Sequence, residues 1–77
     1  MRLKDLREDK DLYQKDLAKI LNIAERTYSG YETGSRNIPN EILINLAKFY
    51  NTSVDYVLGI TNEKKPYPRN VNRKGVE

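Results

Sequence analysis

The chemistry open to this sequence is limited first by two residue types that it lacks. Its 77 residues include no cysteine and no histidine. Disulfides, thiolate or imidazole metal sites, cysteine nucleophiles and histidine general bases are therefore excluded. The sequence also shows no glycine-rich phosphate loop. We expect no enzymatic activity, no metal and no cofactor, and look for function in what charged, amide and hydroxyl side chains can bind.

Arg26 and Glu25 are the side chains best suited to such binding. A guanidinium can donate two parallel hydrogen bonds to O6 and N7 of guanine, and a carboxylate can accept one from N4 of cytosine. Gln14 suits a phosphate if a helix begins there, because helix N-termini are partly positive. Arg36, just past Gly34, could add a charged contact. Each has an ordinary alternative: Arg26 alone could be a solvated surface charge, and Glu25 could simply favour the helix dipole.

Short amphipathic helices are predicted to position these side chains. Apolar residues recur at helical spacing, and no strand-like alternation competes. Glycines 34 and 59 suit helix ends, and Thr52 and Ser53 suit a cap. An all-α fold is therefore expected. Its helices should lie at Arg2–Lys10, at Gln14–Leu21, at about Ala24–Thr33, between Pro39 and Asn51, and between Ser53 and Gly59.

The third predicted helix should have one buried face and one outward face. Ala24, Tyr28 and Tyr31 recur at i, i+4 and i+7, so we interpret the tyrosines as core residues in preference to stacking platforms. The four-residue stretch Asn22–Glu25 separates this helix from the one before it. Two short helices so separated, the second polar outside, fit a helix-turn-helix, whose second helix enters the major groove of DNA.

Four segments of the chain also follow the residue order of one known family. They are RLKDLR (2–7), LYQKDLA (12–18), IAERTYSGYETGSR (23–36) and LAKFYNTSVDYVLG (46–59). Together they resemble the Cro-repressor-type, or Xre-like, helix-turn-helix regulators over residues 2–60. The resemblance implies a compact five-helix repressor-like domain that binds double-stranded operator DNA and regulates transcription.

The resemblance also implies roles for individual residues. Gln14 would touch a phosphate and brace the recognition helix, and Arg7 and Glu32 would form a partly buried ion pair. Glu25, Arg26 and Gly30 match outward positions that family members use to contact base edges. Thr27 matches a position beside the DNA backbone and is also a candidate for a base contact. The remaining phosphate-contact candidates are Thr33, Ser35, Arg36 and Asn37.

Three residues depart from the usual pattern of that family. Tyr13 and Ala24 stand where relatives usually have Ser or Thr, so the second and third helices are expected to lack their N-caps, at about 1 kcal/mol each. Gly30 disfavours the helix and offers no side chain to read a base. The missing side chain would either reduce the number of bases that the third helix reads or let its backbone approach DNA closely, and the sequence does not decide between these.

Charge is distributed unevenly along the chain. Residues 1–60, the predicted DNA-binding domain, hold nine Lys or Arg and nine Asp or Glu, whereas residues 61–77 hold five and two. Too few apolar residues follow Ile60 to offset the entropy of ordering, so residues 61–77 are expected to form an extended or disordered basic tail. Such a tail could seek phosphates or serve only solubility.

We expect a homodimer, because the predicted fourth helix has a wider apolar face than one small core covers and a single small module makes few base contacts. That face comprises Ile42, Leu43, Ile44, Phe49 and Tyr50. The alternative is a protein-binding module, such as an antitoxin-like partner, which the electroneutral domain keeps open. No apolar run suits a signal peptide or membrane span, so we expect a cytoplasmic protein with no membrane partner and no small-molecule ligand.

Overall fold

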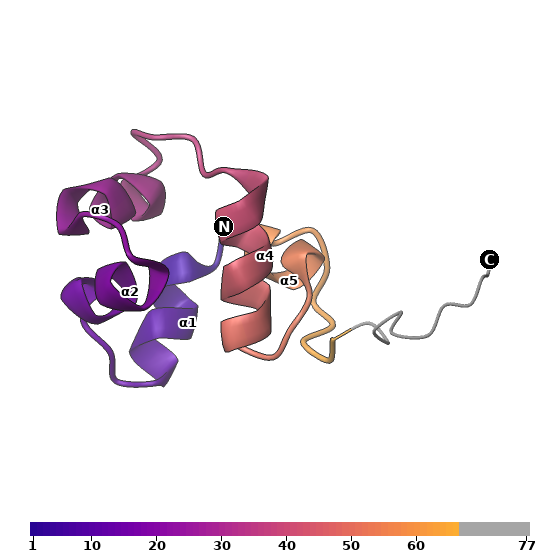
Figure 1. Ribbon diagram of the computed structural model, residues 1–77. Coiled ribbons are helices and arrows are strands. Elements are labelled where there is room, and N and C mark those ends of the chain that lie inside the picture. The colour runs from indigo at the N-terminus through magenta and orange to yellow at the C-terminus, as the bar shows by residue number, and fades with distance from the viewer. Residues whose placement is uncertain (67–77) are drawn as a thin grey trace, which may run out of the picture.

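The described part of the chain folds into five short helices. The computed structural model describes residues 1–66, and the regular secondary structure within them is entirely helical (Figure 1). Each helix falls within a range that the sequence predicts, so the all-α, five-helix fold class is confirmed. The helices are α1 (Leu3–Asp9), α2 (Gln14–Leu21), α3 (Glu25–Thr33), α4 (Asn40–Phe49) and α5 (Val54–Leu58).

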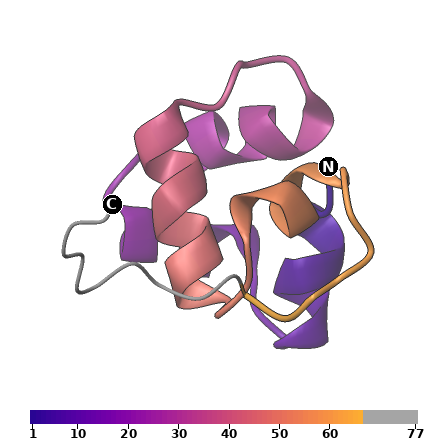
Figure 2. The same cartoon turned by 90° about the vertical axis from the view of Figure 1, so that its right-hand side faces the viewer.

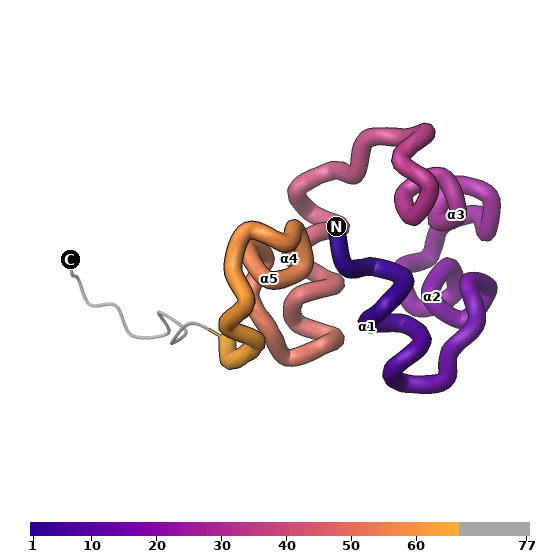
Figure 3. The backbone as a smooth tube through the Cα atoms, turned by 180° about the vertical axis from the view of Figure 1, so that it is seen from behind, coloured from indigo at the N-terminus to yellow at the C-terminus, as the bar shows by residue number. Residues whose placement is uncertain are grey.

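The helices form two groups around α4. Figure 1 shows α2 and α3 on one side of α4 and α5 on the other. Seen from behind, α1 lies between the α2–α3 pair and the α4–α5 pair (Figure 3). This arrangement leaves one long side of α2 and α3 away from the rest of the domain, where a large ligand could reach both helices.

All five helices contribute to one hydrophobic core. The Tyr28 ring on α3 is completely buried, as predicted, and Tyr31 packs partly buried against the same cluster. Ala24 was expected beside them, and this was wrong. It is exposed because it precedes the first turn of α3, with an extended backbone that takes it off the helical stripe. The buried cluster is Leu3, Leu6, Leu17, Ala18, Tyr28, Leu43, Leu46, Ala47, Tyr50 and Val57.

Local hydrogen bonds explain where the helices begin and end. Ser53 caps α5 by accepting from the Tyr56 N–H at 3.0 Å, as its type predicts. Tyr13 provides no side-chain cap for α2, but the Asp16 carboxylate accepts from the Tyr13 N–H at 2.8 Å and satisfies that end in part. Ala24 leaves α3 without a side-chain cap, as expected.

The segment after α5 is tied back to the start of the chain. Arg2 donates to the carbonyl oxygens of Tyr56 and Thr61 at 2.9 and 3.0 Å and to the side chain of Asn62 at 2.9 Å, and its guanidinium lies 4.3 Å from the centre of the Tyr56 ring. The Thr52 hydroxyl donates to the Lys64 carbonyl at 2.6 Å. Figure 2 shows this segment running alongside α1. Contacts with the domain thus continue past residue 60, and the expectations for residues 67–77 lie outside the described residues.

Candidate nucleic-acid interface

A tight turn sets the angle between α2 and α3. Asn22 ends α2 in the left-handed region at φ 58°, a conformation that Asn tolerates better than most residues. The Ile23 N–H then donates back to the Ala18 carbonyl at 2.9 Å, and the Ile23 side chain packs against the core. The turn is therefore fixed by backbone and core together, and α3 leaves it in a defined direction.

The start of α3 presents two charged side chains to solvent. Glu25 and Arg26 are exposed, whereas Tyr28 faces the core and Thr27 lies at the border between the two. Within residues 1–66 no hydrogen bond or ion pair engages the Arg26 side chain, so its guanidinium donors are available to a ligand. An exposed guanidinium on the first turn of a helix suits a ligand approaching α3 end-on or along its outer face.

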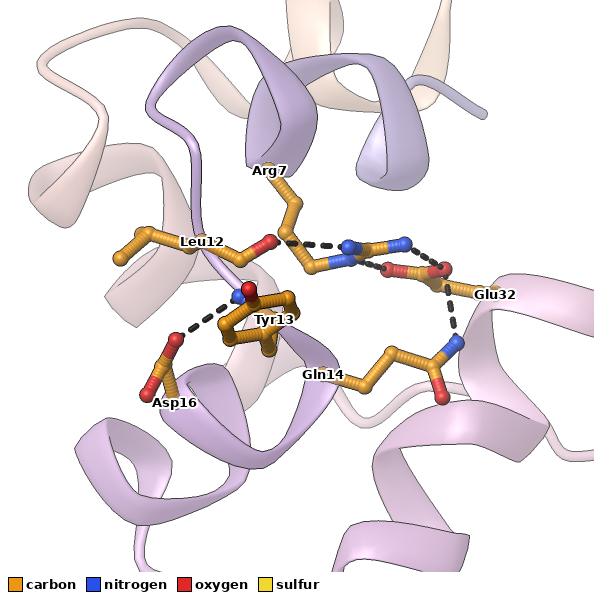
Figure 4. A network of polar contacts seen from close by, with 6 residues as sticks. All are labelled: Arg7, Leu12, Tyr13, Gln14, Asp16 and Glu32. Atoms are coloured by element: carbon orange, nitrogen blue, oxygen red, sulfur yellow. Dashed lines mark hydrogen bonds and ion pairs between the residues drawn. The ribbon is translucent and has the colours of Figure 1, made fainter.

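A buried polar network holds α3 against α1 and α2 (Figure 4). Arg7 donates to both carboxylate oxygens of Glu32, from Nε at 2.7 Å and from Nη2 at 3.1 Å. Its Nη1 donates to the Leu12 carbonyl at 2.9 Å, and the Gln14 amide donates to Glu32 Oε1 at 3.0 Å. The side chains of Arg7 and Glu32 are only 11% and 5% exposed. The ion pair expected between them is thus present, and Gln14 braces α3 as expected.

The charges in this network reinforce one another. Burial alone would raise the pKa of Glu32, but hydrogen bonds from Arg7 and Gln14 outweigh it, so the pKa of Glu32 lies below its ordinary value. The hydrogen bond to Glu32 likewise raises the pKa of Arg7. Burial raises the pKa of the nearby Tyr28 hydroxyl, and that of Tyr50 to about 12. At neutral pH the network therefore consists of one charged pair surrounded by neutral hydroxyls.

The last residue of α3 and the loop after it carry four candidate phosphate contacts. Thr33, Ser35, Arg36 and Asn37 are all exposed. The Thr33 and Ser35 hydroxyls lie 3.2 Å apart, which fixes the chain just after Gly34, itself in the left-handed region at φ 83°. Hydroxyl and guanidinium donors are thereby gathered at the C-terminal end of α3, while Arg26 lies at its N-terminal end.

Gly30 does not occupy an open outward position. It was expected on the exposed face with Glu25 and Arg26, but it is buried, because the loop after Gly34 folds back over it. The Arg36 N–H donates to the Gly30 carbonyl at 3.2 Å, and the aliphatic part of the Arg36 side chain covers the glycine. The sequence pattern placed the residue correctly on α3 but gave no sign of the loop above it.

Lys15 was not singled out from the sequence but belongs to the same surface. A hollow of about 360 Å³ separates the first turns of α2 and α3. Lys15 lines it, with its ammonium 5.5 Å from the centre of the Tyr13 ring. Its position could have been recognised from the sequence, because Lys15 is a cation in the first turn of α2, one residue past Gln14. The other residues lining the hollow are Arg7, Tyr13, Gln14 and Glu25.

Comparison with known proteins identifies the class of this helix pair. A family model described as "Helix-turn-helix" matches residues 3–57. The chain therefore belongs to the helix-turn-helix family, in agreement with the resemblance seen in its residue order. No solved structure matches it significantly.

Several curated proteins are similar to the chain. The uncharacterized HTH-type transcriptional regulator YobD of Bacillus subtilis is 40% identical over 73 residues, which cover 95% of this chain and 65% of YobD. The HTH-type transcriptional regulator AnsR of the same organism is 38% identical, over 88% of this chain and 59% of AnsR. The cryptic phage CTXphi transcriptional repressor RstR of Vibrio cholerae is 34% identical, over 69% and 48%. The chain thus spans between 48% and 65% of the length of these relatives.

Residues 1–66 also lack two features that other classes of protein need. No helix in this part of the chain is long and apolar enough to cross a membrane. Nor does this part contain a group of three or more acidic, cysteine or histidine side chains placed to hold a metal ion.

Proposed function

We propose that the chain is the DNA-binding domain of a repressor-type transcriptional regulator and that α3 enters the major groove of its operator. The observation that carries the proposal is the combination of an exposed Arg26 on the first turn of α3 with a buried brace, Arg7–Glu32–Gln14, behind the same helix. A base-reading helix must hold its side chains in a fixed orientation, and this brace supplies the rigidity. Relatives named as transcriptional regulators support the proposal.

The polar groups divide by position into base-reading and phosphate-binding sets. Arg26 forks to a guanine, with Glu25 and Thr27 beside it for neighbouring bases. Gln14 binds a phosphate with the donor that its bond to Glu32 leaves over, because a side-chain amide has two N–H groups. At the C-terminal end of α3, Thr33 and the loop residues Ser35, Arg36 and Asn37 bind the phosphate backbone. Phosphate contacts from α2 and from this end of α3 would fix the register in which Arg26 meets a base.

The proposal includes a homodimer acting in the cytoplasm on a two-fold operator. Two apolar side chains of α4 support it, since Ile44 is 48% exposed and Phe49 is 37% exposed. Leu43 and Tyr50, expected on the same face, are buried in the domain's own core and are unavailable to a partner. In a dimer that reads two half-sites, the recognition helices lie about 34 Å apart, one turn of DNA.

Selection of duplexes from a random-sequence pool tests this proposal. We expect enrichment of a palindromic site whose half-sites are centred about one helical turn apart, bound by two copies of the chain. A protein that binds its best site as a single copy would contradict the dimer. A pool that shows no enrichment at all would contradict DNA reading and favour the protein-binding alternative.

A further inference from the structure

The loop after α3 rests on the helix at Gly30. The Gly30 carbonyl oxygen accepts hydrogen bonds from the Arg36 N–H at 3.2 Å and from the Thr33 hydroxyl at 3.3 Å. Gly34 reverses the chain between these two donors, with φ 83°. Ser35 and Arg36 are thereby brought back over the glycine instead of continuing away from α3.

The Arg36 side chain fills the space that any side chain at position 30 would need. A Cβ placed on Gly30 would lie 2.8 Å from both Cγ and Cδ of Arg36 and 3.2 Å from the Ser35 hydroxyl oxygen. Ordinary contacts of a Cβ begin at 3.4 Å. Any larger residue at position 30 would therefore push the aliphatic part of Arg36 off the helix, even though Arg36 as a whole is exposed.

We propose that Gly30 is a positioning residue for DNA binding, which lacks a side chain so that Arg36 can lie across α3 and hold its guanidinium against a phosphate. This inference rests on the proposed function and deepens it by explaining why the Arg36 guanidinium is already in position before DNA binds. A side chain held against a helix loses less conformational entropy on binding than a free one.

Local energetics make the choice of glycine informative. Glycine inside a helix destabilises it relative to alanine, so an unconstrained position on α3 would favour Ala. The position of Gly30 is helical, and its φ is not in the left-handed region that requires glycine. Backbone conformation therefore does not call for a glycine here, whereas the packing of Arg36 does.

Direct approach of the DNA backbone to Gly30 is the competing explanation. It is disfavoured because Ser35 and Arg36 already cover the glycine. The two explanations make different predictions for a chain that lacks the Arg36 side chain. If Gly30 acts through Arg36, enlarging it should then have no effect on affinity; if DNA touches Gly30, the effect should persist.

A double-mutant cycle on the full chain tests the proposal. The variants are Gly30→Ala, Arg36→Ala and both together, with Ile20→Ala on the exposed side of α2 as a matched helix substitution. Affinity is measured on the duplex selected from the random pool and on an unselected duplex, from about 50 to 200 mM salt. Thermal melting of each variant reports stability separately.

For each bound copy, we expect Arg36→Ala to weaken binding to both duplexes about tenfold and to reduce the slope of log affinity against log salt by about 0.9, the value for one phosphate. Gly30→Ala should produce at least half of each change with a melting temperature no lower than that of the wild type. In the Arg36→Ala background it should change neither, and Ile20→Ala should change neither in any background.

Three outcomes would overturn the inference, and each has a different meaning. Full affinity of Gly30→Ala beside a weakened Arg36→Ala would show that Arg36 binds DNA without help from the glycine, and would leave the proposed function standing. A Gly30→Ala effect that persists without Arg36 would show direct contact with DNA. Wild-type protein that binds neither duplex would remove the proposed function itself.

Discussion

Replacing Glu32 by Gln should loosen the brace behind α3 while leaving the shape of the side chain almost unchanged. Three donors, Arg7 Nε, Arg7 Nη2 and the Gln14 amide, converge on the two carboxylate oxygens of Glu32. In Glu32→Gln one of those oxygens becomes an amide N–H₂ group that faces a donor, so the Arg7 guanidinium loses its counter-charge and one of its two bonds to position 32, and keeps its bond to the Leu12 carbonyl. The variant therefore leaves a buried cation uncompensated.

The structure sets the size of the expected loss. Removing one partner of a buried ion pair costs about 3 to 5 kcal/mol. The lower end applies here, because Arg7 retains the Leu12 carbonyl. A chain of this length has a free energy of unfolding of roughly 4 to 11 kcal/mol. Glu32→Gln should thus remove a large share of the stability and shift the urea midpoint strongly downward, as followed by far-UV circular dichroism.

The same carboxylate makes a testable contribution to pH dependence. Because hydrogen bonds hold the pKa of Glu32 below its ordinary value of 4.5, the folded state binds this proton more weakly than the unfolded state does. Its stabilisation is therefore fully present above pH 4.5 and is lost as the pH falls through the lower folded-state pKa. That part of the acid dependence should be missing from urea titrations of Glu32→Gln.

Glu25→Gln is the matched control, since Glu25 is an exposed carboxylate on the same helix. It should change the free energy of unfolding by less than about 0.5 kcal/mol. A double-mutant cycle that adds Arg7→Met should show coupling between positions 7 and 32. Equal small effects of Glu32→Gln and Glu25→Gln, or additive effects of the Arg7 and Glu32 substitutions, would refute the brace.

Three other predictions concern different parts of the molecule. The buried Tyr50 hydroxyl has no hydrogen-bond partner within residues 1–66. Tyr50→Phe should therefore leave the free energy of unfolding unchanged, or raise it by up to about 1 kcal/mol, in urea titrations. A clear loss of stability would show that the hydroxyl is bonded. Ser53→Ala should cost about 1 kcal/mol by removing the cap of α5, and an unchanged melting temperature would contradict that role. Deleting residues 67–77, which hold Arg69, Arg73 and Lys74, should make the salt dependence of DNA affinity shallower if the tail binds phosphates. An unchanged slope would show that residues 67–77 take no part in DNA binding.

Most of the fold followed from local patterns in the sequence. Helical spacing of apolar residues, Gly34 and Gly59 at helix ends, and Ser53 as a cap are short-range signals, and they located all five helices in the described range. Ala24 was misplaced because it continues the spacing of Tyr28 and Tyr31 but precedes the helix. Periodicity alone does not show which turn of an element is its first.

The parts of the site that escaped prediction depend on the path of the chain between elements. Burial of Gly30 requires the loop after Gly34 to turn back over α3. Neither glycine, taken alone, predicts this path of the loop. The bonds from Arg2 to Thr61 and Asn62 join positions about sixty residues apart in the chain, so no local pattern encodes them. The Arg7–Glu32 pair was anticipated only through the family resemblance, since helical spacing does not relate α1 to α3.

The role of Arg26 tests the central claim most directly. Binding of the wild type and of Arg26→Ala is measured on the selected operator and on an operator altered at the guanine that Arg26 is proposed to read. Arg36→Ala serves as the contrast. Because Arg26 is exposed, Arg26→Ala should leave the free energy of unfolding within about 0.5 kcal/mol of the wild type.

Arg26→Ala should cost about 1 to 3 kcal/mol per half-site on the selected operator and much less on the altered one, whereas Arg36→Ala should weaken both alike. Equal losses from both substitutions on every duplex would make Arg26 a backbone contact and contradict base reading by the first turn of α3.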